Sequence, residues 1–277
     1  MAGPLALVGG DEFLPGNEPQ DLELVRAAAG RPAYIVTTAA ARQDPARSFA
    51  TARAWFQGLG VEVRQMAVHT RTQARSPAFV DAASGAGMFY LAGGDPGLVP
   101  AVFAGTPVWE AVVAAWRAGA ALAGSSAGSM ALCEWTLVRE RWPDRFNRRY
   151  RPGLGLVPGS VVLPHWEDLG SRWVDSATAG MPRPGVHLIG VEERSAALWD
   201  GDGWRASGRG RCHLVVGGEG IALEPGSRIP HLPRPLTEDP GCDGADGRAH
   251  GRTHHDVTGE VVPQVHPGDA HPARGQE

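Results

Sequence analysis

The chain has 277 residues, of which 43% are apolar, and a formal net charge of −4. This length suits one large domain or two small ones, and the charge gives no electrostatic reason to expect nucleic acid binding. All 26 basic residues are Arg, which excludes reactions that need a lysine Schiff base and excludes Walker-type phosphate binding.

The N-terminal segment 1–10 lacks the basic stretch of a signal peptide and is predicted to form a strand instead. No apolar run is long enough to span a bilayer. Cys133, Cys212 and Cys242 are widely spaced and form no C-x-x-C pair, which indicates neither a zinc ribbon nor a disulfide framework. We therefore expect a cytoplasmic protein without a membrane partner.

Strand-like and helix-like segments alternate through the first half of the chain. Strands are predicted at 5–8, 33–38, 61–66, 87–91 and 119–123, and helices at 21–29, 45–58, 107–118 and 127–134. This alternation predicts a parallel sheet that is covered by helices on both faces. Ligands bind such sheets at the carboxyl ends of the strands, which draws attention to the turns at 9–10, 93–95 and 124–128.

The second half is more β-like and is followed by a change in composition. Strands are predicted at 160–163, 186–191, 196–199 and 212–216, with a hairpin turn at 201–204. From residue 225 onward Pro, Gly, Asp, Arg and His dominate. We therefore predict one hydrolase-like domain over 1–224 and a disordered tail over 225–277.

Two strings in the sequence resemble known motifs without their context. Residues 9–13 spell Gly-Gly-Asp-Glu-Phe, a diguanylate cyclase signature, but only eight residues precede it, so we interpret it as coincidence. The tail contains His250, His254, His255, His266 and His271 at irregular spacing. That spacing indicates a solvated tail, and no metal site is predicted.

A G-x-S-x-G motif spans residues 124–128. It lies between a predicted buried strand and a predicted helix, as in the turn that lifts a nucleophilic serine above a sheet. Ser126 holds the central position, and the helix start would supply N–H groups for an oxyanion. On the motif alone, a glycine-rich turn that only permits close packing is an equal alternative.

A nucleophilic serine needs a base and a group that orients the base. His165 directly follows the predicted strand 160–163, so it should lie at the same edge as Ser126. Glu192 and Glu193 follow the strand 186–191, and alternation of side chains should direct one of them to the site.

An α/β-hydrolase would instead place its acid before the histidine. That order requires Glu140 or Asp144, which lie in an Arg-rich segment that we expect to be helical and solvated.

Four segments match one family in order and spacing: 93–95, 124–128, 153–156 together with 161–165, and 190–196. Over residues 3–220 the chain resembles the serine peptidases of the dipeptidase E and cyanophycinase family. The resemblance implies an α/β, class I glutamine amidotransferase-like (flavodoxin-like) fold, whose mostly parallel sheet is flanked by helices, with a β-rich C-terminal extension.

The same resemblance implies roles for individual residues. Ser126 would be the nucleophile, His165 the base and Glu193 the acid. The N–H groups of Gly94 and Ala127 would form the oxyanion hole, and the reaction would require no metal or organic cofactor.

The chain also departs from the family. Cyanophycinases carry Asp-Gln before the histidine, whereas Leu163 and Pro164 precede His165 here, so cyanophycin is not the expected substrate. Asp95 and Arg172 are candidate substrate contacts. The guanidinium of Arg172 matches the geometry of a substrate carboxylate, and an ordinary surface arginine is an equal interpretation of this residue.

We expect a serine hydrolase that cleaves a small peptide or isopeptide through an acyl-enzyme, with a homodimer as its expected assembly. One alternative is a non-catalytic binding module of the same fold, motivated by Pro96 and the altered residues beside His165. The other is an α/β-hydrolase-type esterase.

Overall fold

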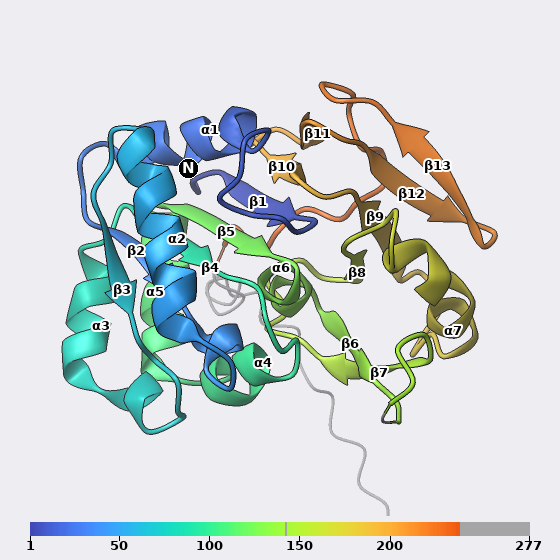
Figure 1. Cartoon of the computed structure of the whole chain (residues 1–277), viewed down its shortest axis with the longest axis horizontal. Coiled ribbons are helices and arrows are strands. Elements are labelled where there is room, and N and C mark those ends of the chain that lie inside the picture. Colours follow the sequence, from blue (N-terminus) through green and yellow to red (C-terminus); the bar gives the residue numbers. More distant parts are fainter. Residues whose placement is uncertain (142, 239–277) are drawn as a thin grey trace, which may run out of the picture. The chain divides into compact units, whose positions relative to one another are not determined.

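The computed structural model describes residues 1–141 and 143–238. Its main sheet has the strand order β11-β10-β1-β5-β4-β2-β3 (Figure 1). Strands β1, β5, β4, β2 and β3 are parallel, and β10 is antiparallel to both of its neighbours, β1 and β11. The strands are β1 (Leu5–Val8), β2 (Ala33–Val36), β3 (Val63–Met66), β4 (Met88–Leu91), β5 (Ala121–Ser125), β10 (Ser195–Trp199) and β11 (Trp204–Gly208). The predicted mostly parallel sheet is confirmed.

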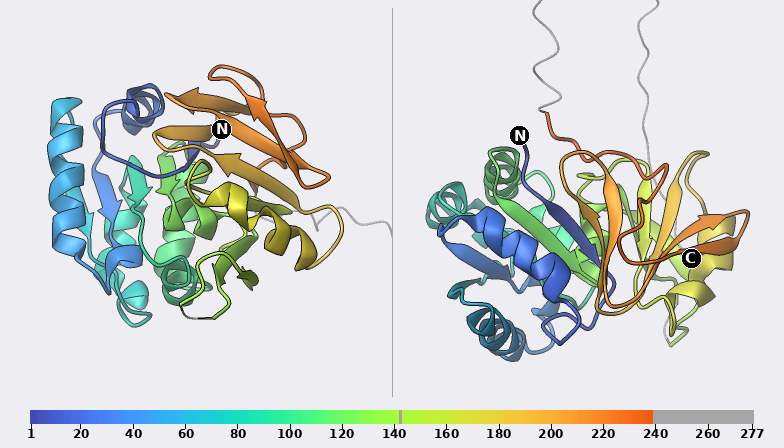
Figure 2. Two further views of the ribbon diagram at one scale, coloured as in Figure 1. Left: turned by 45° about the vertical axis from the view of Figure 1, so that its right-hand side comes forward. Right: turned by 90° about the horizontal axis from the view of Figure 1, so that it is seen from above.

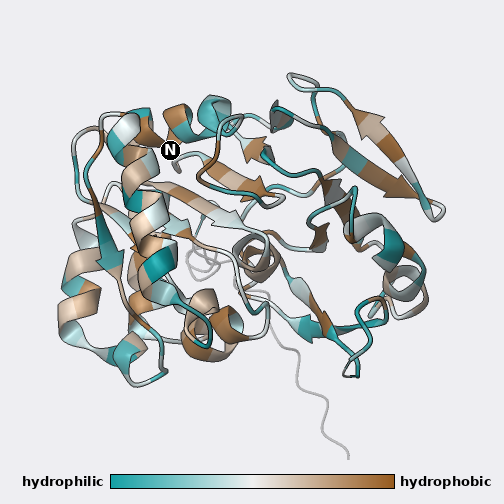
Figure 3. Ribbon diagram, in the orientation of Figure 1, coloured by the Kyte–Doolittle hydropathy of each residue, from teal (hydrophilic) through white to brown (hydrophobic). Residues whose placement is uncertain are grey.

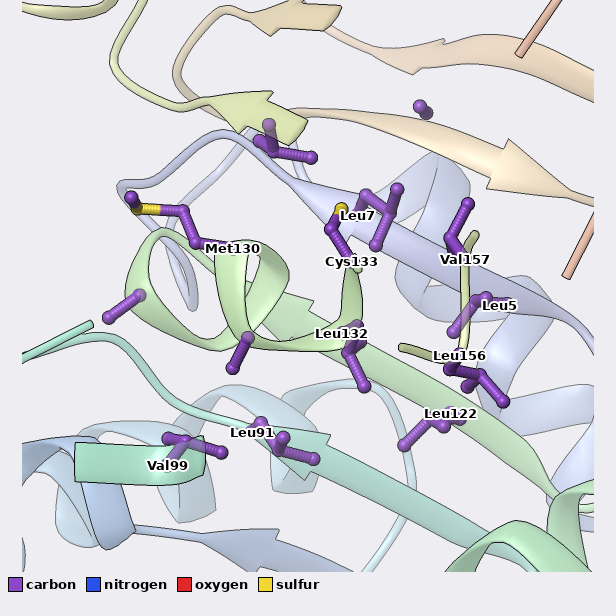
Figure 4. Close-up of a cluster of buried hydrophobic side chains, with 14 of the residues drawn as sticks. Leu5, Leu7, Leu91, Val99, Leu122, Met130, Leu132, Cys133, Leu156 and Val157 are labelled. Atoms are coloured by element: carbon purple, nitrogen blue, oxygen red, sulfur yellow. The ribbon is translucent and has the colours of Figure 1, made fainter. Parts of the chain in front are cut away.

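Helices cover both faces of this sheet (Figures 1 and 2). They are α1 (Glu18–Ala28) and α2 (Pro45–Gly58) on one face, and α3 (Pro77–Ser84), α4 (Leu98–Phe103), α5 (Pro107–Arg117) and α6 (Ala127–Leu132) on the other. Successive side chains of a strand point to opposite faces. Accordingly, Ala6 and Val8 of β1 pack in the core with α1 and α2, whereas Leu5 and Leu7 pack in the other core with Met130 of α6 (Figure 4).

The hydrophobic pattern explains why these segments form their elements. In α5 the buried residues Val108, Val112, Ala115 and Trp116 recur at helical spacing, so one stripe faces the sheet. All residues of β5 are buried, as expected for a central strand covered on both faces. Figure 3 shows apolar residues in the strands of the main sheet and mixed faces on the helices.

A second sheet has the order β13-β12-β9-β8, and a separate hairpin pairs β6 with β7 (Figure 1). These elements are β6 (Trp135–Arg139), β7 (Arg148–Pro152), β8 (Ser160–Leu163), α7 (Val174–Ala179), β9 (His187–Val191), β12 (Cys212–Val216) and β13 (Glu219–Leu223). Short 3-10 helices lie at Thr38–Ala40, Gln73–Arg75 and Gly170–Trp173. The β-rich C-terminal region is therefore confirmed.

The prediction of a helix around Glu140 and Asp144 is wrong, because this segment joins β6 to β7. The carboxylate of Asp144 accepts hydrogen bonds from the backbone N–H groups of Phe146 and Asn147 at 2.7 and 3.1 Å. A short acidic side chain that binds its own neighbouring backbone favours a turn over a helix.

The packed body continues beyond residue 224. In the segment 225–238, assigned above to a disordered tail, Ile229 and Leu232 are buried, and the indole of Trp204 donates to the carbonyl of Pro233. The remainder of the predicted tail, with its histidines and Cys242, lies outside the described residues.

Within the described residues, no helix has the length and apolar character required to cross a membrane. The same residues contain no group of three or more His, Cys, Asp or Glu side chains arranged to hold a metal ion.

Candidate active site

Ser126 occupies a sharp turn between β5 and α6. Its φ of 49° and ψ of −110° lie in a region of backbone conformation that residues other than Gly rarely adopt. Such a strained conformation persists only because contacts with the surrounding structure stabilise it. A Cβ on Gly124 would lie 2.4 Å from the carbonyl carbon of Gly128, and one on Gly128 would lie 2.3 Å from the carbonyl oxygen of Leu91. The two glycines therefore let α6 pack directly against β5 and β4.

Three predicted residues meet at this turn. The imidazole Nε2 of His165 lies 3.0 Å from the hydroxyl of Ser126, and its Nδ1 lies 2.8 Å from Oε1 of Glu193. With Nδ1 donating to the carboxylate, Nε2 accepts the serine hydroxyl proton. The side chains of His165 and Glu193 are 25% and 32% exposed, so the set opens to solvent on one side.

The backbone after β8 presents His165 to the serine. His165 has a φ of 49°, and its N–H donates to the carbonyl of Gly9 at 2.8 Å. A Cβ on Gly10 would lie 2.2 Å from Cε1 of the imidazole. Gly10 thus gives the ring the space it occupies, and the turn after β1 supports the loop that carries the ring.

The structure distinguishes between the two neighbouring glutamates. Glu192 points away from Ser126: its carboxylate binds Nε2 of His213 at 2.8 Å and the backbone N–H of Arg211 at 2.8 Å. His213 is mostly buried and stacks on Trp166 at 4.7 Å between ring centroids. Glu193 is therefore the residue that contacts His165, as expected from alternation along an extended chain.

A third carboxylate lies beside this pair. Oε2 of Glu167 accepts from the backbone N–H of Glu193 at 3.4 Å. Burial, and to a lesser degree the charges of Glu192 and Glu193, raise the pKa of Glu167. The acidic charge at this end of β9 is thus concentrated around the acid that orients His165.

The backbone amides of Gly94 and Ala127 have the features expected of oxyanion donors. Gly94 has a φ of 147°, and a Cβ there would lie 2.3 Å from the carbonyl oxygen of Ala39, so only Gly fits. Ala127 is the first residue of α6, where N–H groups have no partner within the helix. Among the described residues, neither N–H donates to a protein acceptor.

A cavity of about 550 Å³ opens beside Ser126, His165 and Gly94. Its other walls come from the turn after β1, the 3-10 helix Thr38–Ala40, α2 with the segment that leads into it, and the turn after β4. Their residues are Asp11, Glu12, Phe13, Leu14, Ala40, Gln43, Asp44, Arg47, Ser48, Thr51 and Gly93. This volume lies in the range of small-molecule sites.

Two predicted substrate contacts do not line this cavity. The carboxylate of Asp95 accepts from the N–H of Gly97 at 2.8 Å and lies 3.6 Å from the guanidinium of Arg42. The guanidinium of Arg172 lies over the ring of Phe146, 5.4 Å from its centroid. Both side chains are thus engaged with local neighbours, and a role for them in contacting substrate stays a prediction.

Glu12 is a site residue that the sequence analysis did not identify. Its Oε1 accepts from the N–H of Gly93 at 2.9 Å and its Oε2 from the hydroxyl of Ser125 at 2.7 Å. The available signal was the turn at 9–10, where a strand end is followed by two acidic residues. Residues 9–13 also spell the cyclase signature, and this string was interpreted as coincidence because the context of a cyclase domain is missing.

The remaining candidate acids and bases lie elsewhere. Glu140 and Asp144 line a separate pocket on the β6–β7 hairpin. His69 binds the hydroxyl of Thr37 at 3.0 Å, and burial lowers its pKa. The acid-before-histidine order of an α/β-hydrolase is therefore not assembled.

A serine that follows β5 of the main sheet and a histidine and a glutamate that follow β8 and β9 of the second sheet, together with the fold, define the class: the protein is a serine-type peptidase. The model of peptidase family S51 matches residues 16–206. The chain belongs to this family, and it is a serine peptidase of the dipeptidase E type.

Solved structures agree with this assignment. A peptidase from an acI-B1 Actinobacterium is 29% identical, with a TM-score of 0.71 over 83% of this chain and 97% of that chain. A protein described as peptidase E from Listeria monocytogenes EGD-e is 14% identical, with a TM-score of 0.57 over 76% of this chain and 100% of that chain, and this likeness shows the fold alone. Comparison with curated proteins gives no match.

Proposed function

We propose that the protein hydrolyses an amide bond of a small peptide or isopeptide through an acyl-enzyme on Ser126. The observation that carries this proposal is the continuous hydrogen-bonded chain from Ser126 through His165 to Glu193, with distances of 3.0 and 2.8 Å. A non-catalytic binding module would not require this alignment. A histidine too distant to bond to the serine would have supported such a module instead.

The proposed reaction follows from these contacts. His165 Nε2 takes the proton of Ser126 as Oγ attacks the substrate carbonyl carbon, and the N–H groups of Gly94 and Ala127 receive the oxyanion. His165 then gives the proton to the amine as the C–N bond breaks. A water molecule, deprotonated by His165, attacks the acyl ester. The bond between the acyl carbon and Oγ breaks, the carboxylic acid is released, and His165 returns the proton to Oγ of Ser126. Glu193 holds the imidazole tautomer and stabilises its cation throughout.

The cavity supports a small substrate that is not cyanophycin. Its volume of about 550 Å³ suits a short peptide. The residues before the histidine are Leu163 and Pro164, whose apolar side chains offer the substrate neither a carboxylate nor an amide, and both are buried. We therefore propose dipeptides or isopeptides without the aspartyl-arginine unit.

The test is mass-spectrometric screening of a dipeptide and isopeptide library with the wild type and with Ser126→Ala. We expect cleavage by the wild type, and a loss of about 10³-fold or more in kcat for the variant. Ser84→Ala, the same change on the exposed helix α3, serves as the matched control and should cleave like the wild type. Full activity of Ser126→Ala would contradict the assignment of the nucleophile.

A further inference from the structure

The turn that follows β1, residues 9–13, contacts each of the three loops that carry the site. The carbonyl of Gly9 accepts from the N–H of His165, and the carbonyl of Gly10 accepts from the N–H of Arg194, next to Glu193. The carboxylate of Glu12 binds both the loop that carries Gly93 and Gly94 and Ser125 at the serine turn. The turn is therefore a common support for groups that are far apart in the sequence.

Glu12 connects the two halves of the expected oxyanion hole. Oε1 of Glu12 binds Gly93, the residue before Gly94. Oε2 binds Ser125, the residue before Ser126 and Ala127. Ser125 is fully buried, whereas Glu12 lines the cavity, so their hydrogen bond is partly shielded from solvent.

The structure around Glu12 fixes its side chain. Asp11 and Phe13, on either side, have φ angles of 50° and 62°, conformations that need support from other contacts. Arg194 supplies one contact, through its ion pair with Asp11 at 3.0 Å. The ring of Phe13 supplies another, with its centroid 4.9 Å from that of Tyr90. The turn is thus held at both ends while Glu12 points inward.

Gly93 packs closely against Glu12 and the serine turn. A Cβ at this position would lie 3.1 Å from Oε1 of Glu12 and 3.4 Å from Cβ of Ser126. A side chain here would therefore press on the carboxylate and lie in contact with the serine.

We propose that Glu12 is a positioning residue that holds the turn at Gly93 and Gly94 against the turn at Ser126, so that the oxyanion donors and the nucleophile are aligned before substrate binds. This inference rests on the proposed function. A carboxylate would repel a nearby oxyanion, so the contribution of Glu12 is geometric and not a direct stabilisation of the transition state.

Glutamine can test this distinction. The side chain of Gln has one acceptor for the Gly93 N–H and one donor for the Ser125 hydroxyl oxygen, so Glu12→Gln keeps both connections and removes the charge. Glu12→Ala removes both connections.

The experiment compares kcat and KM of Glu12→Ala and Glu12→Gln on the best substrate from the library screen. We expect Glu12→Ala to lose about ten- to a hundredfold in kcat, with KM within about threefold, because a small displacement of aligned groups slows the reaction without weakening binding. Glu12→Gln should restore kcat to within about threefold of the wild type. Glu18→Ala, an acidic residue nearby whose carboxylate binds the Gly16 N–H, is the matched control.

Amide exchange of Gly93, followed by NMR, provides a readout that needs no substrate. Exchange should accelerate in Glu12→Ala and remain slow in Glu12→Gln and Glu18→Ala. Wild-type kcat in Glu12→Ala, or unchanged exchange, overturns the proposal. An equal rise in KM for both Glu12 variants also overturns it, because the charge would then bind substrate directly. Failure of the proposed function is seen separately, as full activity of Ser126→Ala.

Discussion

At the scale of single residues, the two adjacent glutamates after β9 have different environments. Glu193 binds His165, whereas Glu192 binds His213 on the opposite side of the chain. A neutral amide at position 193 could stabilise the wrong imidazole tautomer and could not stabilise its cation.

We therefore expect Glu193→Gln to lower kcat by about 10²- to 10⁴-fold. Glu192→Gln, the same change one residue earlier, should lower kcat by less than about tenfold, since its carboxylate does not reach the imidazole. The measurement is steady-state kinetics of both variants, with thermal unfolding as the check on folding. Equal losses in the two variants would contradict the assignment of Glu193.

The sequence indicates candidate residues best where a side chain closely follows a strand. Ser126, His165 and Glu193 each lie one or two residues after a strand end, and the structure brings them within hydrogen-bond distance although their strands belong to two sheets. Glu12 could not be assigned in this way, because its partners lie 81 and 113 residues away and only the folded chain brings them together. Asp95 was a candidate from its place in the turn 93–95 and Arg172 from its charge, and in the structure both have local partners.

At the scale of elements, the turn after β1 determines where the imidazole can lie. Gly10 has a φ of 135°, and a Cβ there would overlap His165. Gly30 also has a positive φ, of 73°, but no atom lies within 4 Å of its Cβ position.

Gly10→Ala should therefore lower kcat by about ten- to a hundredfold by displacing the imidazole. Gly30→Ala adds the same methyl group at another positive φ and should leave kcat unchanged, with only a modest loss of stability. Kinetics and thermal unfolding of the two variants separate displacement of the ring from backbone strain. Wild-type kcat in Gly10→Ala would show that the ring does not need this space.

Elements with strong periodicity or clear end signals were predicted accurately. The helix 45–58 begins with Asp44 as the N-cap, whose carboxylate accepts from the N–H of Arg47, followed by Pro45. In contrast, α4 is a short helix with nearly all residues buried, so it has no alternating pattern to detect. The β6–β7 hairpin is rich in Arg, which resembles a solvated helix as readily as an exposed strand pair.

At the scale of the whole molecule, one buried carboxylate links global stability to pH. Burial raises the pKa of Asp21 from 3.8 to about 7, against the opposing effect of a hydrogen bond from Trp55. Between these pH values the folded chain holds a proton that the unfolded chain releases. This contribution therefore makes the free energy of unfolding fall as pH rises from about 4 to about 7.

Asp21→Asn should remove this fall, because an amide does not ionise. We expect the stability of the variant relative to the wild type to increase between pH 4 and pH 7, by up to about 4 kcal/mol. Urea unfolding of both proteins across this range measures the difference, and other titrating groups cancel in the comparison. A difference that does not change with pH would contradict the raised pKa.

The catalytic set is divided between two sheets. Ser126 follows a strand of the main sheet, whereas His165 and Glu193 follow strands of the second sheet. While the chain is being synthesised, the serine turn is complete before the second sheet has emerged from the ribosome. At that stage the serine has neither its proposed base nor its proposed acid. On the proposed mechanism, a nascent chain therefore lacks peptidase activity, and activity begins only when the two sheets have assembled.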